Sequence, residues 1–105
     1  MKLYIGGAYQ GQEEVARTEN PGAEIISDFH LLLRDFEGNA QLFAESFCEK
    51  YPDAVVVANE VGAGIVPMDP FDRAYRERAG RAMCVLAQKS ECVVRVLCGI
   101  GVRIK

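Results

Sequence analysis

Long apolar runs and clustered basic residues are both missing from this 105-residue sequence. No apolar stretch reaches the about 18 residues needed to span a bilayer, and the N-terminus shows no apolar signal-peptide core. We therefore expect a cytoplasmic protein without membrane partners. The 12 Lys and Arg residues are scattered and outnumbered by 15 Asp and Glu residues, which gives a formal net charge of −3. Because phosphate backbones are held mainly by clustered Lys and Arg, we expect no nucleic-acid partner.

Paired metal-binding cysteines are also missing. The four cysteines contain no CxxC pair, and His30 is the single histidine, so neither the spacing nor the His cluster of a zinc site is present. The cysteines mostly fall within apolar patterns, where free Cys behaves as a small hydrophobe, so we expect no zinc site and no disulfide.

What the sequence does contain is enough apolar material for one core. Half of the residues are hydrophobic, and the length suits one domain covering residues 1–105. Strand-like and helix-like segments alternate along the chain, which indicates a parallel sheet with crossover helices. We predict a three-layer α/β fold whose mostly parallel sheet has four to five strands. The expected strands are 2–5, 24–29, 54–58 and 92–99, and the expected helices are 12–17, 30–36, 39–50 and 71–89.

Local signals fix several of these elements. Three consecutive valines, at 55–57, are typical of a strand buried on both faces, and we take this strand as the central one. Asp69 is placed to cap the last helix, with Pro70 as its first residue. In the helix at 39–50, the residues on one apolar face are Leu42, Phe43, Phe47 and Tyr51. Gly99 to Gly101 breaks the final strand before residues 102–105.

The loop after the valine strand is the first candidate site. It contains Asn59, Glu60, Gly62 and Gly64 and leads from a buried strand toward a helix. Open α/β sheets bind ligands outside the carboxyl ends of their strands, which is where this loop lies. The alternative is a tight connection whose glycines only satisfy unusual backbone angles.

A second acid is predicted at the same edge. Asp28 lies near the end of the expected strand 24–29, so Asp28 and Glu60 are expected at adjacent strand ends. Two carboxylates could hold magnesium, which needs only one or two protein carboxylates plus waters. Alternatively, both accept hydrogen bonds from loop N–H groups.

A glycine loop between the first strand and the first helix lies where a phosphate-binding loop, with the pattern GxxxxGK[ST], would lie. Gly6 and Gly11 have the right spacing, but Gln12 stands at the Lys position and Glu13 at the Ser/Thr position. The Lys contacts phosphates and the hydroxyl ligates magnesium, so both working side chains are absent. At an effective dielectric of about 20, a carboxylate about 4 Å from a phosphate charge is repelled by about 4 kcal/mol. We expect a nucleoside triphosphate to bind poorly here unless a metal compensates.

Together these segments resemble the bifunctional adenosylcobinamide kinase / adenosylcobinamide-phosphate guanylyltransferase family of cobalamin biosynthesis. The resemblance is carried by NEVGAGIVP at 59–67, by Arg73, Arg76, Gly80 and Arg81, and by GIGVRIK at 99–105. It covers roughly residues 54–105 with high specificity, and GGAxxG and the Asp28 strand extend it weakly.

The resemblance implies a reduced P-loop NTPase-like fold, GTP or ATP with magnesium, a corrinoid substrate and a homo-oligomer. It makes the phosphate loop a nucleotide-binding segment, Asp28 the acid at the end of the second conserved strand, and Glu60 with Gly62 and Gly64 the active-site edge loop. The loop residues concerned are Gly6, Gly7, Ala8, Gly11, Gln12 and Glu13.

This chain departs from the family at the residues that perform catalysis. The family's guanylyl transfer passes through a covalent guanylyl-histidine, but the segment that carries this histidine has shrunk here to little more than residues 18–23. We interpret His30 as a partly buried or helix-start histidine, with a nucleophilic role as the alternative.

Three hypotheses follow. The first is a shortened, degenerate relative that has lost or impaired catalysis but binds a nucleotide or corrinoid fragment. The second is an active cobinamide kinase or guanylyltransferase that uses unconventional residues, with Asp28 and Glu60 as catalytic groups. The third is a non-catalytic homo-oligomeric interaction module.

Overall fold

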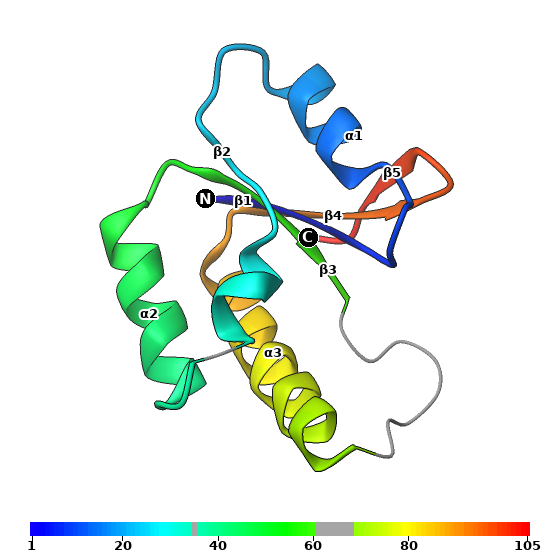
Figure 1. The fold of residues 1–105 in the computed structure, drawn as a ribbon. Helices are drawn as coiled ribbons and strands as arrows, with labels where there is room; N and C mark the ends of the chain where they lie inside the picture. The colour runs from blue at the N-terminus through cyan, green and yellow to red at the C-terminus, as the bar shows by residue number, and fades with distance from the viewer. Residues whose placement is uncertain (35, 61–68) are drawn as a thin grey trace.

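The computed structural model describes residues 1–34, 36–60 and 69–105. Strands and helices alternate along most of the chain, as predicted, and the sheet lies between helices (Figure 1). In chain order the elements are β1 (Lys2–Gly6), α1 (Gln12–Glu19), β2 (Ile25–Ile26), the 3₁₀ helix η1 (Phe29–Leu33), α2 (Ala40–Lys50), β3 (Val55–Asn59), α3 (Pro70–Lys89), β4 (Cys92–Leu97) and β5 (Ile100–Arg103).

The five strands form one mostly parallel sheet in the order β2-β3-β1-β4-β5. The predicted α/β class and strand number are confirmed. β3 is an inner strand, but the middle position belongs to β1, so the prediction that the valine strand is central was wrong. Gly6, at the end of β1, lies opposite both Asn59 of β3 and Val96 of β4. The carboxyl ends of three strands therefore meet at one edge of the sheet.

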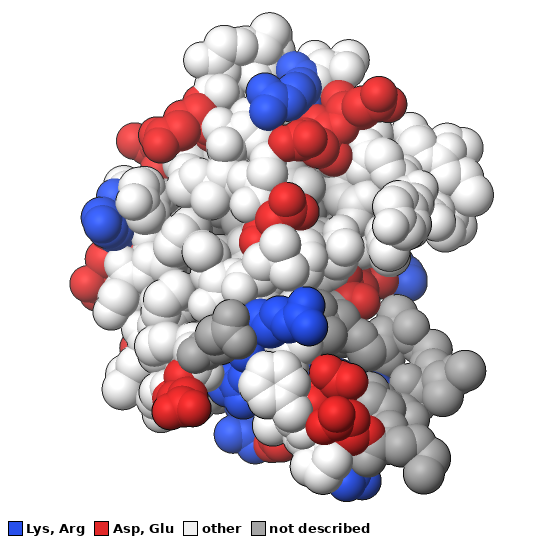
Figure 2. Space-filling view, viewed as in Figure 1, with Lys and Arg blue, Asp and Glu red and all other residues white. Residues whose placement is uncertain are grey.

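Helices cover both faces of the sheet, which gives the predicted three layers. Val56 and Ala58 pack on the side of α2 and α3, whereas Val55 and Val57 pack with Ala16 of α1. This alternation explains why β3 reads as a continuous apolar run. Acidic and basic side chains are interspersed over the face drawn in Figure 2. In the described part of the chain, no helix is long and apolar enough to cross a membrane.

The helix caps follow local sequence rules. Asp69 accepts a hydrogen bond from the Phe71 N–H at 2.8 Å, and Pro70 begins α3, as predicted. Asn39 caps α2 in the same way, because its side-chain oxygen accepts from the Leu42 N–H at 3.0 Å. Leu42 itself is 60% exposed, so its predicted place on the buried face of this helix was wrong.

The segment around Asp28 differs from its prediction. The expected strand at 24–29 is reduced to the two residues of β2, and the expected helix at 30–36 is the short 3₁₀ helix η1. Asp28 has a φ of 57°, a left-handed conformation that cannot continue a strand. Phe29 and Leu33 are fully buried, and their burial holds η1 against the sheet.

The C-terminal segment also differs. The expected strand at 92–99 ends at Leu97, and β5 returns antiparallel to β4. Cys98 and Gly99 have φ values of 50° and 76°, as a two-residue turn of type I′ requires. Gly99 therefore belongs to the break, as predicted, but Ile100 and Gly101 belong to a paired strand.

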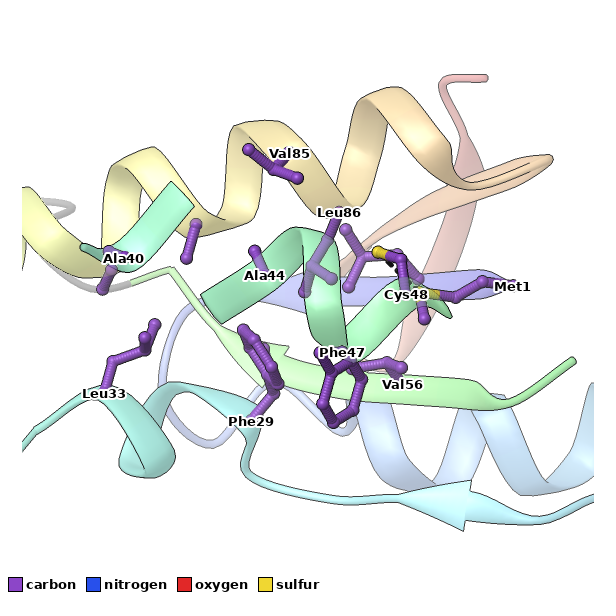
Figure 3. Packing of buried hydrophobic residues seen from close by; sticks show 14 of the residues in the cluster. Met1, Phe29, Leu33, Ala40, Ala44, Phe47, Cys48, Val56, Val85 and Leu86 are labelled. Atoms are coloured by element: carbon purple, nitrogen blue, oxygen red, sulfur yellow. Dashed lines mark hydrogen bonds between the residues drawn. The ribbon is translucent and has the colours of Figure 1, made fainter. Parts of the chain in front are cut away.

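Aromatic packing fixes η1, which carries His30. The Phe29 ring lies edge-on to Phe47, with centroids 4.8 Å apart (Figure 3). We expect Phe29→Ala to lower the free energy of unfolding by about 3–5 kcal/mol, measured by urea denaturation. Phe36→Ala removes a half-buried ring that packs at a tilt against Phe43, and this variant should lose clearly less stability. Equal losses for the two variants would contradict this account of the core.

Candidate functional site

The loop between β1 and α1 has the course predicted for a phosphate-binding loop. It leaves the sheet at Gly6 and enters α1 through Gly11, which has a left-handed φ of 86° and precedes the first helical residue. A Cβ added at Gly6 would lie 2.5 Å from the Val96 carbonyl oxygen, so only glycine fits there. The loop therefore places the N-terminus of α1 beside the carboxyl edge of the sheet, where its positive end favours anions.

The Gln12 side chain fills the centre of this arrangement. Gln12 is only 5% exposed. Its side-chain Nε2 donates to Asn59 Oδ1 at 2.9 Å, to the Gly7 carbonyl oxygen at 3.0 Å and to the Gly6 carbonyl oxygen at 3.1 Å. The Ala58 carbonyl oxygen lies 3.5 Å away. Four oxygens thus converge on one amide nitrogen that has only two hydrogens. An ammonium group offers three donors, so the cluster suits the lysine that the phosphate-loop pattern has at this position.

Glu13 lies in the first turn of α1, with its side chain 49% exposed. Its carboxylate accepts from the Ser27 hydroxyl and from Arg17 Nη2, the latter at 3.3 Å. The hydrogen bond from Ser27, followed by contributions from Arg17, lowers the pKa of Glu13, so the group is ionised at neutral pH. Because the side chain is half exposed, its repulsion of a bound phosphate is closer to the about 1 kcal/mol found in bulk water than to the larger value expected from sequence.

Gln10 joins the same loop to the turn between β4 and β5. The Cys98 N–H donates to Gln10 Oε1 at 2.6 Å, and the Gly99 N–H donates to the Gln10 carbonyl at 2.7 Å. Ala8 is exposed, and its carbonyl accepts from Gln10 Nε2 at 3.4 Å. Sequence reasoning missed this contact because Gln10 and Cys98 lie 88 residues apart and form no motif.

His30 is bound to the end of β3. Its Nδ1 accepts from the Asn59 N–H at 3.0 Å, and the Tyr75 hydroxyl donates to the His30 carbonyl at 3.1 Å. The residue is 6% exposed, so the interpretation of a buried histidine fits. Burial lowers the pKa of His30, with a smaller opposing effect of Asp28. Because Nδ1 accepts a hydrogen bond, the neutral imidazole ring carries its hydrogen on Nε2. Neither ring nitrogen then has a free lone pair for nucleophilic attack.

The structure does not join the two predicted acids. Glu60 donates its N–H to the Gly6 carbonyl at 2.7 Å, and its carboxylate pairs with Arg95 Nη2 at 3.4 Å. Asp28 is exposed, and its negative charge favours the protonated form of His30 and so raises the pKa of that ring slightly. Among the described residues, no hydrogen bond or ion pair links Asp28 to Glu60, and a magnesium pair stays a prediction. Gly62 and Gly64 lie outside the described residues.

Comparison with known proteins agrees with these features. A family model for cobinamide kinase / cobinamide phosphate guanyltransferase matches residues 12–104. The chain is 39% identical over 79 residues to the bifunctional adenosylcobalamin biosynthesis protein CobU of Salmonella typhimurium, covering 74% of this chain and 43% of that protein. It is 48% identical over 59 residues to CobU of Escherichia coli, covering 55% of this chain and 33% of that protein. The alignments thus span less than half the length of these relatives. The family match begins at Gln12, so it does not include the glycine loop at residues 6–11.

The oxygen cluster around Gln12 can be tested by substitution. Gln12→Leu keeps a similar size but leaves buried oxygens of the loop and of Asn59 without a donor. We expect it to lower the free energy of unfolding by about 1–3 kcal/mol, measured by chemical denaturation. Gln12→Lys restores donors in the same place and should retain most of the stability. A leucine variant as stable as the original protein would contradict the assigned network.

The His30 contact predicts a dependence of stability on pH. Burial lowers the pKa of His30 in the folded chain, whereas in the unfolded chain the imidazole keeps its ordinary pKa of 6.5. Just below pH 6.5 the unfolded chain therefore binds a proton that the folded chain does not. The free energy of unfolding should therefore fall as the pH decreases below 6.5. His30→Asn supplies a non-titrating acceptor near the Nδ1 position and should show a weaker fall. Denaturation midpoints measured across this pH range test the prediction, and identical profiles would refute it.

Proposed function

Because the chain belongs to the cobinamide kinase / cobinamide phosphate guanyltransferase family, we propose that it is a shortened relative of the cobalamin-biosynthesis enzymes with lost or impaired catalysis. In this proposal it binds a nucleotide, GTP or ATP, or a corrinoid fragment at the carboxyl edge of its sheet. The protein is then a binding protein rather than an efficient kinase.

The observation that carries the proposal is the position of the Gln12 carboxamide. It donates to Gly6, Gly7 and Asn59 and so holds the loop against β3. A carboxamide is neutral, however, and cannot supply the positive charge that a phosphate-loop lysine provides to the β and γ phosphates. The loop thus retains its shape while lacking the charge that stabilises phosphoryl transfer.

Glu13 weakens the case for catalysis further. The pattern requires a hydroxyl there to ligate magnesium, and a carboxylate already committed to Ser27 and Arg17 replaces it. Magnesium, when bound, would neutralise charge on the phosphates. The exposed carboxylate of Asp28 suits a water-rich magnesium site, whereas that of Glu60 would have to leave Arg95.

Guanylyl transfer through a histidine has no support from the contacts of His30. In the neutral ring, Nε2 holds the hydrogen because the Asn59 N–H occupies Nδ1. Attack by Nε2 would require this contact to break so that the proton could move to Nδ1. His30 therefore serves to position the end of β3, beside Gln12's partner Asn59.

What remains at this edge favours binding of an anion. The loop N–H groups and the N-terminus of α1 offer a positive electrostatic end. Its strength is reduced by Glu13, whose charge is partly screened by solvent and by Arg17. We therefore expect weak binding that improves when the two altered side chains are returned to the phosphate-loop pattern.

Thermal denaturation with GTP or ATP and magnesium tests this proposal. A ligand at one hundred times its Kd adds about 2.7 kcal/mol, which raises the Tm by several degrees for a domain of this size. We expect a small rise for the original protein and a larger one for the Gln12→Lys, Glu13→Ser double variant. The same titration with cobinamide tests corrinoid binding.

A matched control separates site chemistry from net charge. Gln41→Lys with Glu45→Ser makes the same change in charge at exposed positions of α2, away from the loop, and should behave like the original protein. If neither the original protein nor the restored variant responds to any ligand, the binding proposal is wrong. Efficient cobinamide phosphorylation or guanylyl transfer by the original protein would show instead that catalysis is intact.

A further inference from the structure

The loop between β1 and α1 carries a tyrosine that the rest of the chain leaves uncovered. Tyr9 is 102% exposed, so both faces of its ring are open to solvent. The other tyrosines are covered to a much greater extent, because Tyr4 is 2% exposed and Tyr51 and Tyr75 are half-buried. Tyrosine usually packs its apolar ring and leaves only the hydroxyl in water. Tyr9 therefore gains no stability from packing of its ring.

The main chain of Tyr9 is in an unfavourable conformation as well. Its φ of 61° is left-handed, which glycine and asparagine tolerate and which brings the Cβ of a bulky residue too close to the following carbonyl oxygen. Hydrogen bonds on both sides hold the loop in this conformation. Gln12 Nε2 donates to the Gly7 carbonyl on one side of the tyrosine. On the other side, the Cys98 N–H donates to Gln10 Oε1. Exposure and strain thus both count against a tyrosine at this position.

Tyr9 lies at the edge of the sheet where the ligand is proposed to bind. It is three residues before Gln12, the first residue of α1, and the N-terminus of that helix favours anions. A ring on a loop that is fixed on both sides needs little further ordering when a ligand covers it, so the entropic cost of the contact is small. Strained residues that persist beside a binding site are commonly retained for function at the expense of stability.

We propose that Tyr9 binds the ligand through its ring, which stacks on a flat conjugated ring of the bound molecule. This inference rests on the proposed function, because the ligand is the one expected at the carboxyl edge of the sheet. Two such ligands carry a ring of this kind, which is the purine base in GTP or ATP and the corrin ring in a corrinoid. Stacking on an aromatic side chain needs a π face and no specific hydrogen bond, so the same residue suits either ring.

Titrations followed by ¹⁵N–¹H NMR, in the presence of magnesium, separate the ring from the phosphates. Methyl triphosphate has the triphosphate group of GTP but no sugar or base. If the base stacks on Tyr9, GTP and ATP should bind at least about tenfold more tightly than methyl triphosphate, because stacking on an aromatic side chain contributes a factor of this order. Tyr9→Leu should remove the difference and leave the affinity for methyl triphosphate unchanged.

A titration with cobinamide tests the corrin ring in the same way. If this ring stacks on Tyr9, Tyr9→Leu should raise the Kd for cobinamide by at least about tenfold. Tyr9→Phe is the matched control, because it keeps the flat ring and removes only the hydroxyl. This variant should bind each ligand as tightly as the original protein does.

Stability provides a test that needs no ligand. Tyr9→Asn should raise the Tm, measured by circular dichroism, because asparagine adopts a left-handed φ more readily and no packing is lost. Tyr9→Leu keeps the strain, so its Tm should stay close to that of the original protein. A side chain that lowers stability while it raises the affinity for ring-bearing ligands is one that is retained for binding.

The outcomes distinguish this inference from the proposed function. If the original protein binds none of these ligands, both fail together. If it binds them but GTP, ATP and methyl triphosphate have equal affinities, and Tyr9→Leu does not weaken the binding of cobinamide, the stacking contact alone is wrong. A Tm of Tyr9→Asn no higher than that of the original protein would contradict the strain from which the inference is drawn.

Discussion

The hydrogen bonds of the Gln12 carboxamide are the interaction on which the candidate site depends. They join the start of α1 to the end of β1 through Gly6 and Gly7, and to the end of β3 through Asn59. Asn59 in turn donates its N–H to His30, which belongs to η1. One buried amide therefore ties the loop between β1 and α1 to the end of β3, 47 residues further along the chain, and Asn59 extends the connection to η1. The loop cannot change shape without leaving polar groups unpaired in a buried position.

This arrangement separates the shape of a phosphate loop from its chemistry. Glycine at position 6 is required because the Val96 carbonyl occupies the space of a side chain, and Gly11 supplies the left-handed residue before α1. These constraints are steric and do not depend on the residue at position 12. Charge at the site depends on that residue, and a carboxamide supplies none. Family membership and the loop's geometry are thus compatible with a proposed loss of phosphoryl transfer.

Sequence reasoning succeeded where the determinants are local. The valines at 55–57 predicted a strand buried on both faces, and Asp69 with Pro70 predicted the start of α3, because strand burial and capping depend on neighbouring residues. The family resemblance was also confirmed, since its motifs are contiguous.

The failures have physical causes too. The strand before Asp28 was predicted too long because a left-handed φ at an aspartate is not encoded by the apolar pattern. The hairpin at Cys98 was missed because cysteine is an unusual residue for a positive φ. The contacts from Gln12 to Asn59 and from Asn59 to His30 span 47 and 29 residues, so no local pattern contains them. Sequence identified Gln12 as a substitution but not as the donor at the centre of the site.

Hydrogen exchange of the Gln12 side-chain amide, followed by NMR with ¹⁵N labelling, tests the central claim most directly. The two Nε2 hydrogens are held by buried acceptors, so they should exchange much more slowly than those of Gln41 and Gln88, which are exposed. Slow exchange that is confined to Gln12 would establish the carboxamide as the link between loop and sheet. Exchange as fast as that of the exposed glutamines would show that the side chain does not hold the loop, and the account of the site would fail.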